Sequence, residues 1–166
     1  YAFSNRGNPI FSRYRYLVEP YFNLPQGFEY SIGQRGSESQ GGVHMYTYTS
    51  SIGKYYKAYW ISFRVNYYTP LSSTSYSINI RRFFNDDPYR YVGIVVGTGR
   101  TPDIADNITN NIISNSTVSF GTYGQFLLVR NLYMNFSAGY TRDNFTPPGT
   151  TIRNEIILGG GLKWLF

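Results

Sequence analysis

The sequence predicts an all-β fold of antiparallel strands, and three observations support this prediction. Apolar and polar residues alternate with a period of two along most of the chain, which is the pattern of strands whose two faces differ. Aromatic residues, which favour strands, make up 19% of the composition, with 18 Tyr and 12 Phe. No segment has the apolar spacing of an amphipathic helix, or the run of ~18 apolar residues that a membrane-spanning helix requires.

Each expected strand rests on one stretch of this alternation. In the clearest stretch Tyr76, Ile78 and Ile80 lie on one face, and the residues between them are polar. Comparable apolar series begin at Tyr59, Val92, Val118 and Met134. We expect a short strand at Tyr1–Phe3 and nine complete strands, near residues 10–22, 28–36, 43–52, 55–68, 73–84, 90–99, 115–129, 132–143 and 152–166.

The lengths and connections of these strands favour a membrane barrel. Many strands have 10 to 13 residues, more than the ~5–6 typical of soluble sheets and close to a tilted strand that crosses a membrane. Going backward from the C-terminus, every second connection is long and polar: 143–151, 100–114, 69–72, 36–42 and 4–9. The connections between them are mostly tight, at 130–131, 85–89, 53–54 and 23–26. Outer-membrane barrels have short periplasmic turns and longer external loops.

Two barrel architectures fit such strands, and the composition distinguishes them. A soluble lipocalin- or avidin-like barrel has apolar residues inside, whereas a membrane barrel turns its apolar face to lipid. Charged residues are only 14% of this chain, against ~25% in typical soluble domains. The polar faces consist mainly of small residues and isolated Arg, which suits a confined interior. We therefore expect residues 1–166 to form a single domain, an antiparallel transmembrane β-barrel, with a soluble ligand-binding barrel as the weaker alternative.

The C-terminus carries the most specific feature of the sequence. Ile156, Leu158, Leu162, Trp164 and Phe166 fall on one face of the last expected strand, and Phe166 ends the given sequence. This pattern resembles the signal by which bacterial outer-membrane barrels are recognised for insertion. Leu162, Trp164 and Phe166 are thus the candidate insertion signal, and the resemblance implies contact with the barrel-insertion machinery. The alternative is an ordinary amphipathic strand that ends on Phe by chance.

Charged residues on the polar strand faces are the candidate lumen residues. They are Arg13, Arg15, Glu19, Glu29, Arg35, Arg64, Arg81, Arg153, Glu155 and Lys163. One interpretation is a network of Arg and Glu that braces a narrow barrel, because buried charges need partners. The other is a basic pore or cleft for an anionic polymer or lipid. Tyrosines near the expected strand ends, among them Tyr55 and Tyr91, are expected to form aromatic girdles at the lipid interfaces.

The central part of the chain resembles a known family. The segments Tyr59-Trp60-Ile61-Ser62-Phe63-Arg64 and Arg81-Arg82-Phe83-Phe84, and Gly97-Thr98-Gly99-Arg100-Thr101-Pro102-Asp103, are similar to the YaiO-type outer-membrane β-barrel family. Glu19-Pro20-Tyr21 is similar to an earlier strand of that family, with Pro and Tyr in the reverse order. The resemblance spans roughly residues 1–166. It implies an outer-membrane location and frequent kinship with the barrels of exopolysaccharide export proteins, and it supplies no catalytic motif.

The expected number of strands does not fit a closed barrel by itself. Bacterial single-chain barrels usually have an even number of strands, whereas we expect nine and a short one. Family members normally carry about three strands before the position of Ser12. Our hypothesis is therefore that the first two strands and part of a third are missing, and that the full barrel has twelve. Alternatively, Tyr1–Phe3 begins a short tenth strand that closes the barrel. An intact mass near 19.1 kDa for the protein would contradict the missing strands.

The sequence offers little support for cofactor, metal or nucleic-acid chemistry. There is no Cys, so thiol catalysis and zinc–cysteine sites are excluded. The net charge of +6 is dispersed, with only Arg81 and Arg82 adjacent, which argues against nucleic acid. Asp86 and Asp87 suit a turn, and Asp103 and Asp106 suit a solvated loop better than a calcium site. We expect no cofactor and no metal.

One histidine keeps an enzyme hypothesis open. His44 lies near an expected outer loop, and Ser37, Glu38 and Ser39 are close to it in sequence. No nucleophile elbow or His-bearing signature accompanies these residues. The expected function is therefore a bacterial outer-membrane barrel without catalytic activity that acts as a pore, scaffold or subunit of a surface or export assembly. Expected partners are membrane lipid, other outer-membrane or periplasmic subunits, and an anionic glycan. The alternative is a lipid- or peptide-acting enzyme that uses His44.

Overall fold

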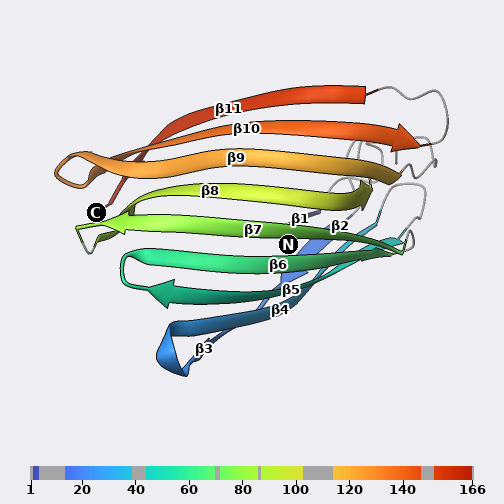
Figure 1. Ribbon diagram of the computed structural model, residues 1–166, viewed down its shortest axis with the longest axis horizontal. Coiled ribbons are helices and arrows are strands. Elements are labelled where there is room, and N and C mark those ends of the chain that lie inside the picture. Colours follow the sequence, from blue (N-terminus) through green and yellow to red (C-terminus); the bar gives the residue numbers. More distant parts are fainter. Residues whose placement is uncertain are drawn as a thin grey trace.

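The computed structural model confirms the all-β class. It describes residues 2–3, 14–38, 44–69, 72–85, 87–102, 114–146 and 152–165. The strands form one antiparallel sheet in chain order, with β3 paired to β4 beside β2 (Figure 1). The elements are β1 (Ala2–Phe3), β2 (Tyr14–Val18), β3 (Tyr21–Leu24), the 3-10 turn η1 (Pro25–Gly27), β4 (Phe28–Glu38), β5 (His44–Tyr56), β6 (Tyr59–Thr69), β7 (Ser73–Phe84), β8 (Asp87–Pro102), β9 (Ser114–Val129), β10 (Leu132–Thr146) and β11 (Ile152–Trp164).

The expected strand at 10–22 is one strand with an interruption. Tyr14 pairs with Glu38 in β4, and Tyr21 pairs with Ser31 in the same register, so β2 and β3 run along β4 without a shift. Pro20 lies in the gap between them, and proline has no N–H to donate to the ladder. The part of the prediction at 10–13 lies outside the described residues.

The expectation of a turn at residues 53–54 is wrong. Both residues lie inside β5, and the chain reverses at Lys57 and Ala58, with Lys57 in the left-handed region at a φ of 51°. Gly53 serves packing instead, because a Cβ there would lie 3.0 Å from the indole nitrogen of Trp60. The other short turns are confirmed near the expected positions, at Pro25–Gly27, Asn85 and Arg130–Asn131.

Strands also extend beyond their expected ends. β8 and β9 have 16 residues each and β10 has 15. Asp143, which we expected to begin a loop, therefore lies within β10. Among the described residues, no helix is long and apolar enough to cross a membrane.

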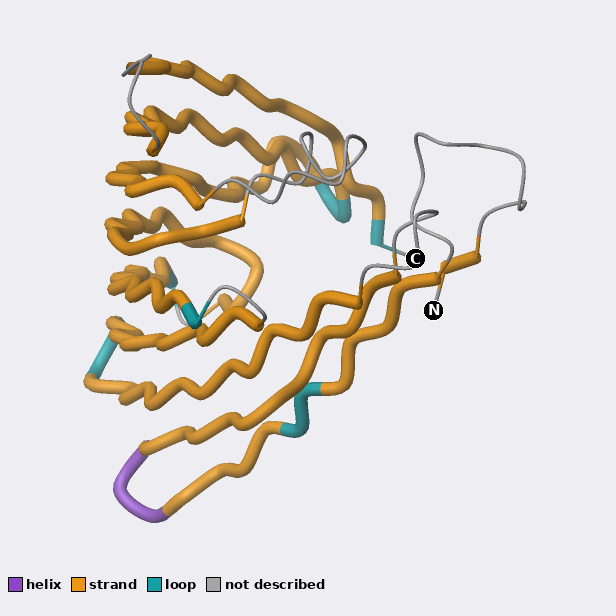
Figure 2. The backbone as a smooth tube through the Cα atoms, turned by 90° about the vertical axis from the view of Figure 1, so that its right-hand side faces the viewer, coloured by secondary structure: helices purple, strands orange, loops and turns teal. Residues whose placement is uncertain are grey.

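The sheet is curved, and its two edges do not meet in the described part of the chain (Figure 2). β1 and β11 form these edges. The expectation of further strands in a twelve-stranded barrel stays a prediction. We call the concave side, which carries Ser31 and Arg64, the inward face, and the convex side the outward face.

The two faces differ in chemistry as the alternation predicts. Large apolar side chains such as Ile78, Phe120 and Leu158 project from the outward face, and Leu158 is 77% exposed. Small polar side chains on the inward face are buried, including Ser31, Thr49 and Ser75. An apolar outward face and a polar inward face are the arrangement of a membrane barrel and the reverse of a soluble one.

This difference between the faces can be tested with single spin labels. The chain has no Cys, so Ser77→Cys and Ile78→Cys each give one labelling site. In the protein reconstituted in lipid vesicles, we expect the label at 78 to be relaxed by oxygen, which partitions into lipid. The label at 77 should be relaxed more by a water-soluble nickel complex. Equal accessibility at both positions would contradict the assignment of faces.

Candidate functional site

Charged residues on the inward face form three groups, and the most connected group centres on Arg64. Arg64 Nη2 lies 2.8 Å from Glu19 Oε1, and Nη1 donates to Glu19 Oε2 at 3.0 Å. Two contacts between one guanidinium and both carboxylate oxygens form a strong and directional ion pair. The Glu19 side chain is 9% exposed and that of Arg64 33%. The pair is therefore largely withdrawn from solvent.

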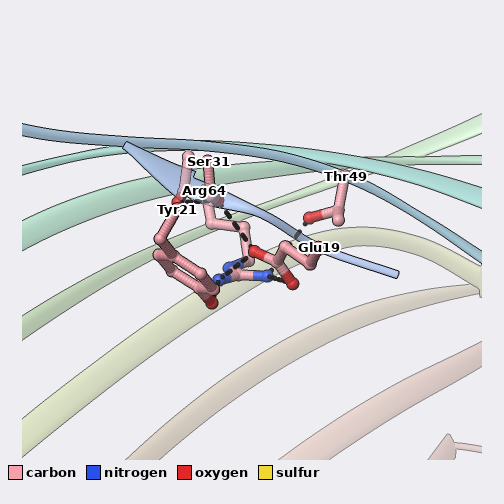
Figure 3. A network of polar contacts seen from close by, with 6 residues as sticks. Glu19, Tyr21, Ser31, Thr49 and Arg64 are labelled. Atoms are coloured by element: carbon pink, nitrogen blue, oxygen red, sulfur yellow. Dashed lines mark hydrogen bonds and ion pairs between the residues drawn. The ribbon is translucent and has the colours of Figure 1, made fainter. Parts of the chain in front are cut away.

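Further polar side chains complete this group (Figure 3). Arg64 also donates to Thr49 Oγ1 at 3.2 Å and to the Tyr21 hydroxyl at 3.1 Å. Ser31 Oγ donates to Glu19 Oε1 at 2.8 Å and lies 2.6 Å from Ser51 Oγ. We call these six residues the Arg64 network. It joins β6 to β5, to β4 and to the β2–β3 strand, and so fixes the curvature of this wall.

The local sequence makes room for this network. Arg64, Ser51 and Ser31 are directly opposite one another on adjacent strands, so two small hydroxyl residues lie beside the long guanidinium. Gly33 lies beneath Glu19, because a Cβ at Gly33 would be 2.7 Å from the Glu19 Cβ. Any larger residue at 33 would displace the carboxylate that pairs with Arg64.

A second group surrounds Arg81 with aromatic rings. The guanidinium carbon lies 4.4 Å from the centroid of Tyr91, 5.1 Å from Trp60, 5.4 Å from Tyr123 and 5.9 Å from Phe83. Cation–π contacts of this kind stabilise a partly desolvated guanidinium. We call these residues the Arg81 cage.

Hydrogen bonds hold the Arg81 cage in place. Arg81 Nε and Nη2 donate to the Tyr123 hydroxyl at 3.3 and 3.2 Å, and this hydroxyl donates to Asn79 Oδ1 at 2.7 Å. Gly93 lies under the Tyr123 ring, which a Cβ there would approach to 2.6 Å. In the described ranges Arg81 forms no ion pair with a carboxylate. Its charge is held by rings and neutral oxygens.

A third group lies on the last two strands. Arg153 Nη2 is 3.3 Å from Asp143 Oδ2 and 3.7 Å from Glu155 Oε2, and Thr117 Oγ1 donates to Asp143 Oδ1 at 2.8 Å. Asp143 is 5% exposed. Asp143 pairs with Thr117 and Arg153 across the two ladders, and the pairing of β10 with β9 continues to Thr146, past the expected loop boundary.

The candidate lumen charges are divided among these groups. The structure brings together Glu19 with Arg64 and Arg153 with Glu155, whereas Arg81 contacts aromatic rings. Glu29 occupies an inward position opposite Gly53, and within the described part of the chain its side chain forms no hydrogen bond or ion pair. Lys163 lies over the Tyr89 ring at 4.9 Å.

Several other predicted site residues lie on described strands but belong to none of the three groups. Arg15 and Arg35 lie at inward positions of β2 and β4, opposite Ser37 and Leu17. Leu162 and Trp164 project outward from β11 with exposed side chains, and their role as an insertion signal stays a prediction. Arg13 and Phe166 lie outside the described residues.

The His44 group lies on the outward face, near the longer connections. His44 Nδ1 is 3.5 Å from the Tyr14 hydroxyl and 3.9 Å from Glu38 Oε2. Glu38 pairs directly with His44 across the ladder, whereas Ser37 is one residue away and therefore projects from the opposite face. Ser37 and His44 thus lie on opposite faces of the sheet, and Ser39 lies outside the described residues.

Sequence reasoning missed the neutral partners in these groups. Tyr91, expected in a lipid-interface girdle, points inward at Arg81, and Tyr55 is likewise inward, opposite Trp60. Tyr91 lies two residues from Gly93, so both are on the same polar face of the strand. This spacing could have indicated the inward position of Tyr91. Tyr21, Thr49 and Asp143 gave no such signal, because their contacts depend on the register between strands.

The comparisons with known proteins agree with this architecture. The model of the YaiO membrane beta barrel domain family matches residues 1–104, a shorter range than the resemblance that we inferred. This range includes the Arg64 network and the first part of the Arg81 cage. No curated protein and no solved structure matches the chain.

Removing one member of the ion pair should lower the free energy of unfolding more than removing both members. Arg64→Met leaves the Glu19 carboxylate in the interior without its cation, and we expect the free energy of unfolding to fall by about 2 kcal/mol, since Arg64 is partly exposed. The double variant Glu19→Gln/Arg64→Met should lose less than Arg64→Met alone, and therefore less than the sum of the single variants. Denaturant unfolding in lipid vesicles, followed by tryptophan fluorescence, measures these values.

Arg35→Met is the matched control for this cycle. Arg35 is also an inward arginine, and it lies outside the Arg64 network, so its replacement should change the free energy of unfolding by less than about 0.5 kcal/mol. Additive effects of Glu19→Gln and Arg64→Met would contradict the pairing.

Proposed function

The chain belongs to the YaiO membrane β-barrel domain family and lies in the bacterial outer membrane, and on this premise we propose that it is a non-catalytic barrel subunit of a surface or export assembly. Its wall is a scaffold, and its inward face contacts an anionic glycan. The family membership also decides against the soluble ligand-binding barrel. The observation that carries the proposal is that the Arg64 network, which braces the wall, and the Arg81 cage lie on the same inward face.

The Arg64 network supports the scaffold role. Its charged atoms form an ion pair with each other and hydrogen bonds with neutral hydroxyl groups, so this part of the interior is stabilised without a ligand. The network links side chains from four adjacent strand segments, which keeps the wall in one shape. A wall of fixed shape can hold external loops and periplasmic turns in the fixed positions that an assembly partner needs.

The Arg81 cage supports the glycan contact. Sugar rings stack on aromatic side chains, and acidic sugars carry carboxylates or phosphates that pair with guanidinium groups. Trp60, Tyr91 and Tyr123 present such rings beside a cation that forms no ion pair with the described carboxylates. Other inward positions, such as Ser77 and Ser119, carry small hydroxyl side chains that can make further contacts.

A mild cross-linking pull-down from native membranes tests both parts of this proposal. We expect the tagged protein to retain outer-membrane or periplasmic subunits together with bound acidic polysaccharide, measured by mass spectrometry and uronic acid assay. Arg81→Glu should reduce the bound polysaccharide at least fivefold by charge repulsion, and it should retain the protein partners. Arg35→Glu makes the same charge change elsewhere on the inward face and should retain both.

Two outcomes would contradict the proposal. Recovery of the protein alone from membranes would contradict the assembly role. Equal polysaccharide on the wild-type, Arg81→Glu and Arg35→Glu proteins would contradict the glycan contact.

The alternative of an outer-membrane hydrolase rests on His44, Tyr14 and Glu38. The outward position of His44 and the orientation of Ser37 give it no described nucleophile. We expect the purified protein to hydrolyse lipid and peptide ester or amide substrates no faster than His44→Ala. Hydrolysis by the wild type that His44→Ala abolishes would overturn the non-catalytic assignment.

A further inference from the structure

Three cations cluster on the outward face at the short-turn end of the sheet. Lys54 and Arg82 project from β5 and β7, and Lys57 lies in the turn between β5 and β6. All three are exposed. We call them the basic patch.

Each cation of the basic patch rests on an outward-facing aromatic ring. Lys54 Nζ lies 4.4 Å from the ring centroid of Phe28, and Lys57 Nζ lies 5.5 Å from that of Tyr56. The guanidinium carbon of Arg82 lies 5.2 Å from the ring of Phe84 and 5.9 Å from that of Tyr59. Aromatic rings and long cationic side chains are the residue types that occupy the boundary between hydrocarbon and headgroups.

The register places these residues side by side. Tyr56 pairs with Tyr59, and Tyr59 pairs with Arg82, while Lys54 pairs with Phe28 on the other side of β5. The basic patch therefore spans adjacent strands β4 to β7 in one region of the outward face. It is a local concentration of positive charge and not a set of scattered surface residues.

No carboxylate on the described outward face of β4 to β7 neighbours the basic patch, and Asp87 of β8, the ladder partner of Phe84, forms an ion pair with Arg90 at 3.3 Å. The outward positions next to it carry apolar or aromatic residues, such as Ile52, Ile61 and Ile80, and Glu29 projects inward. In the described ranges the three cations form no ion pair with protein. A group of positive charges at the edge of hydrocarbon needs anions from its surroundings.

The orientation of the barrel identifies these anions. Short turns of outer-membrane barrels face the periplasm, so the basic patch lies at the periplasmic leaflet, which is made of glycerophospholipid. Among the side chains that the structure describes, the outward face at the opposite end has Glu38, His44 and Arg142 and no comparable cluster of cations. We propose that the basic patch binds the phosphates of anionic glycerophospholipids in the periplasmic leaflet.

Spin-labelled lipids test this binding with the full chain reconstituted in neutral phosphatidylcholine vesicles. The measurement is the association of labelled phosphatidylglycerol relative to labelled phosphatidylcholine. Each cation near a membrane surface contributes about fivefold to the attraction of an anionic lipid, so we expect the wild type to prefer phosphatidylglycerol by about tenfold or more at low salt. This preference should fall as salt is raised.

Two variant sets locate the effect. Lys54→Gln/Lys57→Gln/Arg82→Gln should bind the two lipids equally, whereas Arg35→Gln/Arg142→Gln/Lys163→Gln, with the same loss of charge elsewhere, should keep the preference. Heat-modifiable migration on gels confirms folding, and Lys54→Gln/Lys57→Gln provides a milder variant that should lose most of the preference. Excess soluble glycerol phosphate should not compete, which distinguishes a lipid site from a site for free phosphate.

Several results would overturn the inference. They are equal association of both lipids with the wild type, an unchanged preference in the folded triple variant, and an equal loss in the control set. Competition by soluble glycerol phosphate would assign the patch to free phosphate instead of lipid.

Discussion

Lipid hydrocarbon offers no partner to a polar group, and this constraint governs every part of the molecule. Long strands satisfy their backbone donors and acceptors through neighbouring strands, so the described chain is one continuous antiparallel ladder. Side chains that face lipid have to be apolar, which moves the polar ones to the inward face. The charges on that face that are buried, such as Glu19 and Asp143, then need partners at close range. The Arg64 network and the Asp143–Arg153 pair are the result.

Small residues make this interior possible. Gly33 accommodates Glu19, Gly53 accommodates Trp60, and Gly93 accommodates Tyr123. In each case the absence of a side chain on one strand leaves space for a large functional side chain from its neighbour. The glycines of this sheet therefore position the charged and aromatic groups of the inward face, in addition to easing its curvature.

The same constraint separates two kinds of arginine. Arg64 is neutralised within the protein, whereas Arg81 and Arg82, adjacent in sequence, project from opposite faces and are held mainly by aromatic rings. Arg81 presents its charge to the interior and Arg82 to the lipid boundary. A scaffold whose charges are paired within the protein at one place and available at two others can remain rigid and still offer cations to the internal glycan and the external lipid that we propose as ligands.

The sequence by itself determined the strand pattern, the two faces and the membrane location, because alternation and composition are properties of neighbours along the chain. It also identified Glu19, Arg64, Arg153 and Glu155 as inward charges. Only the tertiary structure decided which of them meet, since the pairing of Glu19 with Arg64 depends on the register of four strand segments and on the curvature between them. For the same reason the inward role of Tyr91, the burial of Asp143 and the packing role of Gly53 were not predictable. Alternation tells which face a side chain takes, and strand register tells which side chain it touches.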